Sequence, residues 1–254
     1  MTKKTIFLTL VTLISLSALS QNDTLFVMRN GMIIYQKALS EIDSILYYRD
    51  NFNLTGTYFD SRDSTIYPTI IIGNQIWFAA NLRYLPSVSP PTIFSSLTPH
   101  YYVYDYIGNN VIDAKNRINY QNFGALYNYK AALTACPNGW HLPNATEYEI
   151  LVNYLGGSSI AGGKMKTTDL NYWNLPNSGA TNESGFSGWG GGFYRSQSEE
   201  FKNLKNFGYY WSSPSTYQHD IATGYILAVN TTGIISNSFL MYYGFSIRCI
   251  KNPF

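Results

Sequence analysis

The sequence predicts a β-rich and loop-rich fold that contains two helices. The 254 residues include 23 tyrosines and 20 glycines but only 13% charged residues, and tyrosine favours strands whereas glycine favours turns. Short apolar runs alternate with turn residues over most of the chain, which is typical of antiparallel strands. Residues 123–135 and 144–155 instead show the spacing of apolar residues that an amphipathic helix requires.

Residues 1–20 have the features of a signal peptide. Two lysines near the start precede an apolar stretch from Ile6 to Leu19, and Ala18-Leu19-Ser20 fits the small-x-small cleavage rule. The stretch is short for a membrane span, and no later segment reaches about 18 consecutive apolar residues. We therefore expect export to the periplasm, the cell surface or the medium, and a mature chain without a transmembrane segment.

The charge balance argues against nucleic acid as a partner. The net charge is +2 at pH 7, and the charged share of 13% is about half of the usual 25% or so. Binding to nucleic acid requires lysines and arginines clustered on one face. No such cluster is visible in the sequence.

The first part of the chain is predicted to form a leader and a linker. Residues 21–49 contain Asn30-Gly31 between two apolar runs, which is a strong hairpin signal. Residues 50–64 are rich in Asp, Asn and Ser, so we expect a linker that leads into the main domain at 65–251. Within that domain Gly73-Asn74 separates two more apolar runs and predicts a second hairpin.

The segment 136–149 predicts a short strand followed by the second helix. Trp140 and Leu142 alternate as in a half-buried strand, and the proline that follows ends it. Asn144 with Glu147 three residues later predicts a capping box at the helix start.

The chain after this helix is predicted to contain a long loop and then strands. Residues 157–192 are rich in Gly, Asn and Ser. Their glycine run 185–192 lacks the lysine and the helix of a phosphate-binding loop, so we expect tight turns packed against aromatic side chains. Further strands are predicted over residues 209–213, 224–229, 233–236 and 245–250.

The chain has two cysteines, Cys136 and Cys249, which are separated by 113 positions (249 − 136). In an oxidising compartment two cysteines favour one disulfide, and the alternative is two free thiols. In the chain-entropy model a disulfide across a loop of about 100 residues stabilises the fold by roughly 4–5 kcal/mol.

Six motifs that occur in order carry a resemblance to a known family. They are Gly73-Asn74-Gln75-Ile76-Trp77 with Asn81-Leu82, Gly124 to Ala132, Cys136-Pro137-x-Gly139-Trp140-His141-Leu142-Pro143, Gly185-Phe186-Ser187, Trp211-Ser212-Ser213 and Gly244-Phe245-Ser246-x-Arg248-Cys249. Together they resemble the Fibrobacter succinogenes major paralogous domain (FISUMP) over residues 55–251.

That family is more distantly similar to the C-type-lectin-like fold and to the formylglycine-generating sulfatase-modifying enzymes. The resemblance implies an α+β fold with two helices, twisted antiparallel strands and long irregular loops, and a Cys136–Cys249 disulfide. Tyr148 departs from the tryptophan that is usual in the enzymes' motif. The resemblance marks these side chains as fold motifs: Trp77, Trp140, Leu142, Pro143, Glu147, Trp211, Phe245 and Arg248.

The sequence favours a protein that is not an enzyme. The sulfatase-modifying enzymes need reactive cysteines and copper, so an oxidase of that type is retained only as an alternative function. His100, His141 and His219 lie far apart without zinc-binding spacing. No Gly-x-Ser-x-Gly motif is present. The Trp140-His141 pair is either a binding pair or, as we expect, a core tryptophan beside an exposed histidine.

Calcium is the one cofactor that the sequence leaves open. Lectin-like folds bind calcium through loop carboxylates and amides, and Asn-rich loops otherwise form turns. No EF-hand spacing occurs. The candidate ligands are Asp169, Asn171, Asn174, Asn177, Asn182 and Glu183.

A glycan or surface polymer is the expected ligand of an exported protein with these loops. The candidate contacts are Tyr172, Trp173, Trp189 and Tyr194, beside Asn and Asp side chains. In the alternative, Trp173 and Trp189 fill the core beneath the loops. The chain would then be a structural or protein-interaction component of the bacterial envelope, and fold similarity alone does not decide between these roles.

Overall fold

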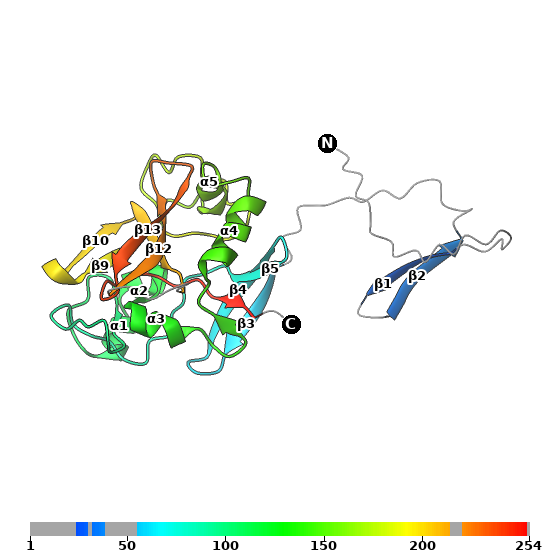
Figure 1. Cartoon of the computed structure of the whole chain (residues 1–254). Coiled ribbons are helices and arrows are strands. Elements are labelled where there is room, and N and C mark those ends of the chain that lie inside the picture. The colour runs from blue at the N-terminus through cyan, green and yellow to red at the C-terminus, as the bar shows by residue number, and fades with distance from the viewer. Residues whose placement is uncertain (1–23, 30–31, 39–54, 214–219, 253–254) are drawn as a thin grey trace. The chain divides into compact units, whose positions relative to one another are not determined.

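The computed structural model describes residues 24–29, 32–38, 55–213 and 220–252 (Figure 1). The signal peptide predicted over residues 1–20 lies outside the described residues. The chain divides into two units, residues 1–52 and 53–254. In the first unit, β1 (Thr24–Arg29) and β2 (Met32–Ala38) pair antiparallel, which confirms the first predicted hairpin.

The second unit is a mixed α+β fold with mostly strands, as predicted. Its strands are β3 (Thr55–Asp60), β4 (Thr65–Ile72), β5 (Gln75–Phe78), β6 (Tyr101–Tyr102), β7 (Leu126–Tyr127), β8 (Trp140–His141), β9 (Gly191–Arg195), β10 (Glu200–Leu204), β11 (Phe207–Trp211), β12 (Ile221–Ala228), β13 (Ile234–Leu240) and β14 (Ile250–Lys251). Its helices are α1 (Val111–Lys115), α2 (Ile118–Phe123), α3 (Tyr129–Ala135), α4 (Ala145–Tyr154) and α5 (Ala161–Met165), with a 3₁₀ turn η2 (Ser196–Ser198). The described chain therefore has short helices in addition to the two that were predicted.

Two five-stranded sheets organise this unit (Figure 1). One has the strand order β3-β4-β5-β14-β8, and the other has the order β10-β9-β11-β12-β13. The strands β6 and β7 form a separate antiparallel pair. No helix in the described part of the chain is long and apolar enough to cross a membrane.

The second predicted hairpin is confirmed, and part of the predicted linker is a strand. Gly73 and Asn74 connect β4 to β5 with Ile72 opposite Gln75. Residues 55–60, which were assigned to the linker, form β3 and pair with β4. The threonines, the tyrosine and the phenylalanine of this segment favour a strand, and their preference outweighs that of the polar residues beside them for irregular structure.

The second predicted helix is confirmed with its capping box. The Asn144 Oδ1 atom accepts from the Glu147 backbone N–H at 2.9 Å. In return, the Glu147 carboxylate accepts from the Asn144 backbone N–H at 2.8 Å. The reciprocal bonds satisfy amides that the first helical turn leaves without partners.

The first predicted helix starts later than the sequence suggested. The segment 123–135 contains the end of α2, the strand β7 and then α3. Gly124 has a φ of 77°, and a Cβ atom there would lie 2.7 Å from the Leu82 carbonyl oxygen. The buried Asn128 side chain then caps α3 by accepting from the Ala131 N–H. Leu126 therefore belongs to a strand, although its spacing fits a helix.

The predicted strand over 245–250 is largely wrong, because the backbone of this segment bonds to several different elements. Phe245 exchanges hydrogen bonds with Tyr127, whereas the Ile247 carbonyl accepts from Leu82 N–H. The Cys249 carbonyl accepts from Phe78 N–H, and only Ile250–Lys251 forms a regular strand. Because this segment passes from one element to the next, its backbone does not pair with a single neighbouring strand.

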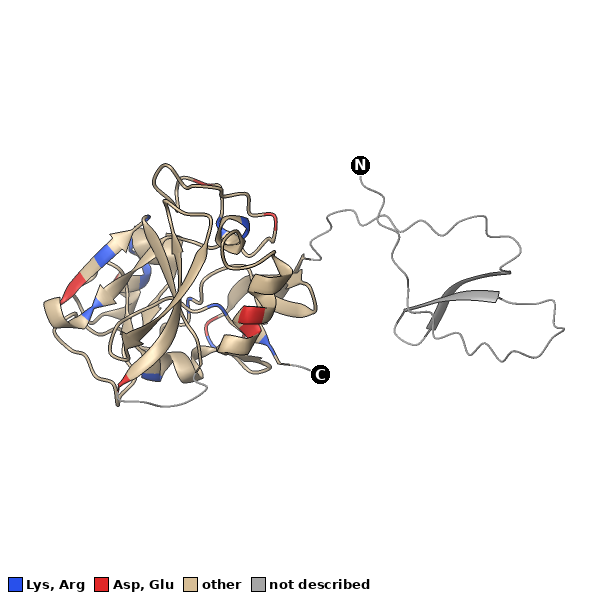
Figure 2. Cartoon of the chain, turned by 45° about the horizontal axis from the view of Figure 1, so that its top comes forward, with Lys and Arg blue, Asp and Glu red and all other residues tan. Residues whose placement is uncertain are grey.

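The core is aromatic, and the charged side chains are sparse. Trp77, Trp173, Trp211 and Phe245 are fully buried, and Trp211 stacks on Phe245 with ring centroids 4.2 Å apart. Figure 2 shows the lysines and arginines scattered over several elements of the described chain.

Arg248 is a fully buried cation that connects three segments. Its Nε donates to Asn81 Oδ1 at 2.9 Å, and one terminal nitrogen donates to the carbonyls of Phe78 (3.2 Å) and Phe186. The other terminal nitrogen donates to the Ser187 carbonyl at 2.6 Å. Burial lowers the pKa of the guanidinium, and these four acceptors replace the water that it loses.

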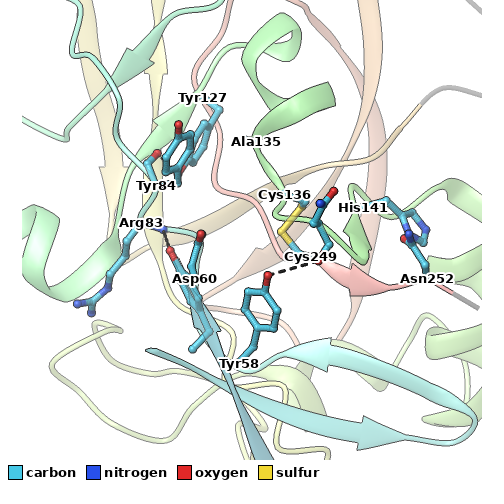
Figure 3. Close-up of a disulfide and its surroundings, with 12 residues drawn as sticks. Tyr58, Asp60, Arg83, Tyr84, Tyr127, Ala135, Cys136, His141, Cys249 and Asn252 are labelled. Atoms are coloured by element: carbon cyan, nitrogen blue, oxygen red, sulfur yellow. Dashed lines mark hydrogen bonds between the residues drawn. A yellow bond between two sulfur atoms is a disulfide. The ribbon is translucent and has the colours of Figure 1, made fainter. Parts of the chain in front are cut away.

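The predicted disulfide between Cys136 and Cys249 is confirmed, and no free cysteine occurs in the described residues (Figure 3). The two Cα atoms are 5.8 Å apart. Cys136 is the C-terminal cap of α3, and Cys249 lies directly before β14. The bond therefore joins the end of a helix to the last strand of the first large sheet.

Removing the disulfide is expected to destabilise the fold strongly. The double variant C136S/C249S should lose up to roughly 4–5 kcal/mol of unfolding free energy, because the unfolded chain regains the freedom of a 113-residue loop. Urea unfolding measures the loss. Reductant should lower the stability of the wild-type protein to that of the variant, and an unchanged wild-type curve would contradict the prediction.

Replacing Arg248 should also be costly. Arg248→Met leaves three buried acceptors and one partly buried acceptor without this donor, and each buried one costs about 1–3 kcal/mol, so we expect a loss of at least roughly 3 kcal/mol in urea unfolding. Arg248→Lys should also destabilise, because a single ammonium cannot reproduce the planar fork. The control Arg195→Met changes an exposed arginine on β9 and should cost less than about 0.5 kcal/mol. Similar losses at both positions would contradict this account.

The buried tyrosines predict a loss of stability in alkali. Burial raises the pKa of Tyr67, Tyr102, Tyr127 and Tyr148, and it raises that of Tyr120 to about 12. A group whose pKa is higher in the folded state stabilises fully below its unfolded pKa, about 10 for tyrosine, and loses that contribution as the pH rises further. The free energy of unfolding should fall above about pH 10.

Phenolate absorbance, measured beside the unfolding curves, tests this assignment. Most of the tyrosine signal should appear together with unfolding and not before it. Gradual ionisation near pH 10 in a chain that is still folded would show that these phenols are accessible.

Candidate functional site

The aromatic residues that the sequence assigned to ligand contact lie mainly in the core. Trp173 and Tyr194 are fully buried, and Trp189 is 8% exposed. Tyr172 is half-buried and stacks on Trp189 with ring centroids 4.7 Å apart. Three of the four therefore lack the exposure that ligand contact would need, and Trp173 and Trp189 fill the core, as in the alternative interpretation of the sequence. The long loop 157–192 folds over its own aromatic side chains, which a sequence pattern does not reveal.

The loop residues proposed as calcium ligands bond mainly to the loop itself. Asp169 accepts from the Asn171 N–H at 2.8 Å, and Asn182 accepts from the Ser187 N–H at 2.8 Å. Glu183 pairs with a lysine at 2.8 Å. Within the described residues, no group of three His, Cys, Asp or Glu side chains is arranged to hold a metal. The contacts resemble those of tight turns.

Each of the two described histidines contacts two polar side chains through its ring nitrogens. His141, which is partly exposed beside the buried Trp140, contacts Asn252 at 2.7 Å and the capping carboxylate of Glu147 at 2.8 Å. The ring nitrogens of His100 contact the hydroxyls of Ser89 and Thr98. A hydrolytic triad needs a carboxylate on one of these nitrogens, and both are occupied by hydroxyls. The third histidine, His219, lies outside the described residues.

Lys166 is a second buried cation. Its Nζ donates to the carbonyls of Ser178, Ala228 and Thr231 at 2.8–2.9 Å and lies 5.5 Å from the centre of the Trp173 ring. Burial lowers its pKa to about 8. The ammonium uses its three donors on backbone carbonyls, so it holds the loop to the second sheet and presents no group to solvent.

A surface hollow of about 470 Å³ lies on the face of the sheet that contains β3, β4 and β5. We call it the β3 hollow. It is lined by residues 55–58 of β3, by Thr69, Ile71 and Ile76, by the loop residues Asn138 and Gly139, by Trp140 of β8, and by Lys251.

Tyr58 closes one side of the β3 hollow. Its hydroxyl donates to the Asn138 carbonyl at 3.3 Å, and its ring meets Trp140 edge-on with centroids 5.5 Å apart. Figure 3 shows the Tyr58 side chain extending from its strand toward the segment that carries Cys136. Because the disulfide fixes that segment two residues before Asn138, the wall of the hollow is anchored covalently.

The β3 hollow combines hydroxyl groups with apolar surface. Ile71 and Ile76 provide aliphatic surface, and Tyr58 and Trp140 provide aromatic surface. The Thr69 hydroxyl and the amide of Asn138 provide neutral hydrogen-bonding groups. Lys251 is the charged side chain of the lining, which contains no carboxylate. Such a surface suits a ligand that carries both hydroxyl groups and apolar faces.

This hollow was not expected from the sequence. Residues 55–58 were assigned to a linker, and the segment 136–149 was interpreted only as part of the fold. One local signal was available, because threonine alternates with glycine and tyrosine over residues 55–58. The approach of β3 to the 138–140 loop, about 80 residues away, depends on tertiary structure and has no sequence signal.

The comparisons with known proteins give one result. The family model of the Fibrobacter succinogenes major domain matches residues 70–251, which is more than half of the chain. No curated protein and no solved structure matches the chain. Because this match covers more than half of the chain, the chain belongs to the Fibrobacter succinogenes major domain family.

Proposed function

We propose that the chain is an exported, non-catalytic binding protein that holds a saccharide unit of a surface polymer in the β3 hollow. The observation that carries the proposal is the lining of this hollow. A pyranose ring has hydroxyl groups at its rim and C–H groups on its faces. The Thr69 hydroxyl and Asn138 suit the first, and Ile71, Ile76 and Tyr58 suit the second.

Two further observations support this proposal. The Cys136–Cys249 disulfide fits an oxidising compartment, which agrees with the signal peptide expected from the sequence. An oxidase that resembles the sulfatase-modifying enzymes would need a reactive thiol, and both cysteines of the chain are joined to each other. We therefore propose binding and not oxidation.

Polysaccharide binding by the full-length protein tests the proposal. Plant and bacterial polysaccharides are screened, and calorimetry gives the affinity of any that bind. Ile71→Arg places a long charged side chain in the hollow, so we expect affinity to fall by at least about ten-fold, equivalent to 1.4 kcal/mol. Ile235→Arg is the matched control, because Ile235 is also an exposed strand isoleucine but lies on β13.

The control should bind within about two-fold of wild type. Equal losses for both variants would indicate a general effect of the added charge. The absence of binding across the panel would argue against a saccharide ligand and favour a structural or protein-interaction role.

A further inference from the structure

Among the described residues, the edge of the first large sheet at β3 is open. The sheet order places β3 outermost, and β4 is the only described strand that pairs with it. Beyond that ladder, the backbone N–H and C=O groups of residues 55–59 make no hydrogen bond within the described part of the chain. A row of unpaired strand groups is a template for another strand.

The register identifies which backbone groups point outward. The Pro68 carbonyl accepts from Ala79 N–H, so Pro68 directs its backbone toward β5 and away from β3. Its cross-strand partner Thr57 is therefore in a non-hydrogen-bonded pair and directs its own N–H and C=O away from β4. The same alternation places the N–H and C=O groups of Thr55 and Phe59 on the open edge.

The corresponding edges of the second large sheet are protected. The outer strand β10 carries the ion pair Glu200–Lys202 at 2.6 Å, and charged side chains discourage edge pairing. On the opposite edge, β13 has the Ile234 N–H bonded to Ser158 and the Ser238 N–H bonded to Asn237 Oδ1. In β3 the only charged residue is Asp60, which is buried and paired with Arg62.

An apolar surface lies beside the open edge. Phe59 and Ile66 are directly opposite each other on β3 and β4 and are 58% and 64% exposed. Pro68, on the same face two residues along β4, is also exposed. We call these three residues the β3 ledge. A strand added to the edge with apolar side chains on this face would bury Phe59.

We propose that the β3 edge binds an extended polypeptide segment of a partner protein as an additional strand. Alternating outward N–H and C=O groups, repeated about every 6.6–6.8 Å, match another strand and not a saccharide. A second copy of this chain fits less well. In the antiparallel register that pairs all three outward residues of each copy, Thr55 of the copy, and no apolar side chain, lies opposite Phe59. The inference does not depend on the ligand of the β3 hollow.

A random dodecapeptide library displayed on phage, selected against the full-length protein, tests this proposal. We expect enrichment of peptides that alternate β-branched or aromatic residues and lack proline. Thr57→Pro removes one outward N–H, and proline is tolerated on the solvent side of an edge strand. It should weaken peptide binding by at least about ten-fold, or 1.4 kcal/mol, whereas Thr57→Val keeps the N–H and should bind within about two-fold.

Circular dichroism establishes whether Thr57→Pro is folded. If it is not, Thr55→Pro provides the same test, because proline is also tolerated at the first residue of a strand. Failure to enrich peptides, or equal binding by the proline and valine variants, would overturn the proposal. A concentration-dependent dimer that Thr57→Pro dissociates would overturn it in favour of pairing between two copies.

Discussion

The fold depends on satisfying one buried positive charge. Within the described residues the Arg248 guanidinium has no carboxylate partner, so neutral acceptors must replace its hydration. They come from the end of β5, from Asn81 and from the glycine-rich loop at Phe186-Ser187. Asn81 also donates to the Phe123 carbonyl and to Ser246. The cation therefore fixes the positions of segments that are far apart in sequence.

The next residue, Cys249, connects this segment covalently to the end of α3. Arg248 binds the interior of the unit, and Cys249 is joined to Cys136 at the end of α3. From that anchor the loop reaches Asn138, which accepts the Tyr58 hydroxyl at the wall of the β3 hollow. The buried cation and the disulfide thus fix two adjacent residues of the same segment, one to the interior and the other to the end of α3. A hollow whose wall is fixed in this way needs little reordering when a ligand binds.

The features that the sequence predicted well are those with local physical causes. The Asn144–Glu147 capping box, the Gly73-Asn74 turn and the single disulfide each depend on few residues with strong preferences. The predicted helix over 123–135 was interrupted by Gly124, whose required φ is set by the neighbouring Leu82 backbone. The sequence left open whether Trp173 and Trp189 are exposed or buried, because aromatic residues in a loop occur both on surfaces and beneath them, and both side chains are buried.

The strand β3 shows why a face and an edge of one sheet can have separate roles. In an extended strand successive residues differ both in the face of their side chains and in the direction of their backbone groups. Tyr58 directs its ring to the hollow while its backbone pairs with β4. Phe59 directs its backbone to the open edge, and its ring is part of the β3 ledge. A saccharide against Tyr58 and a strand beside Phe59 would therefore use different side chains, whereas Thr55 and Thr57 belong both to the lining of the hollow and to the edge.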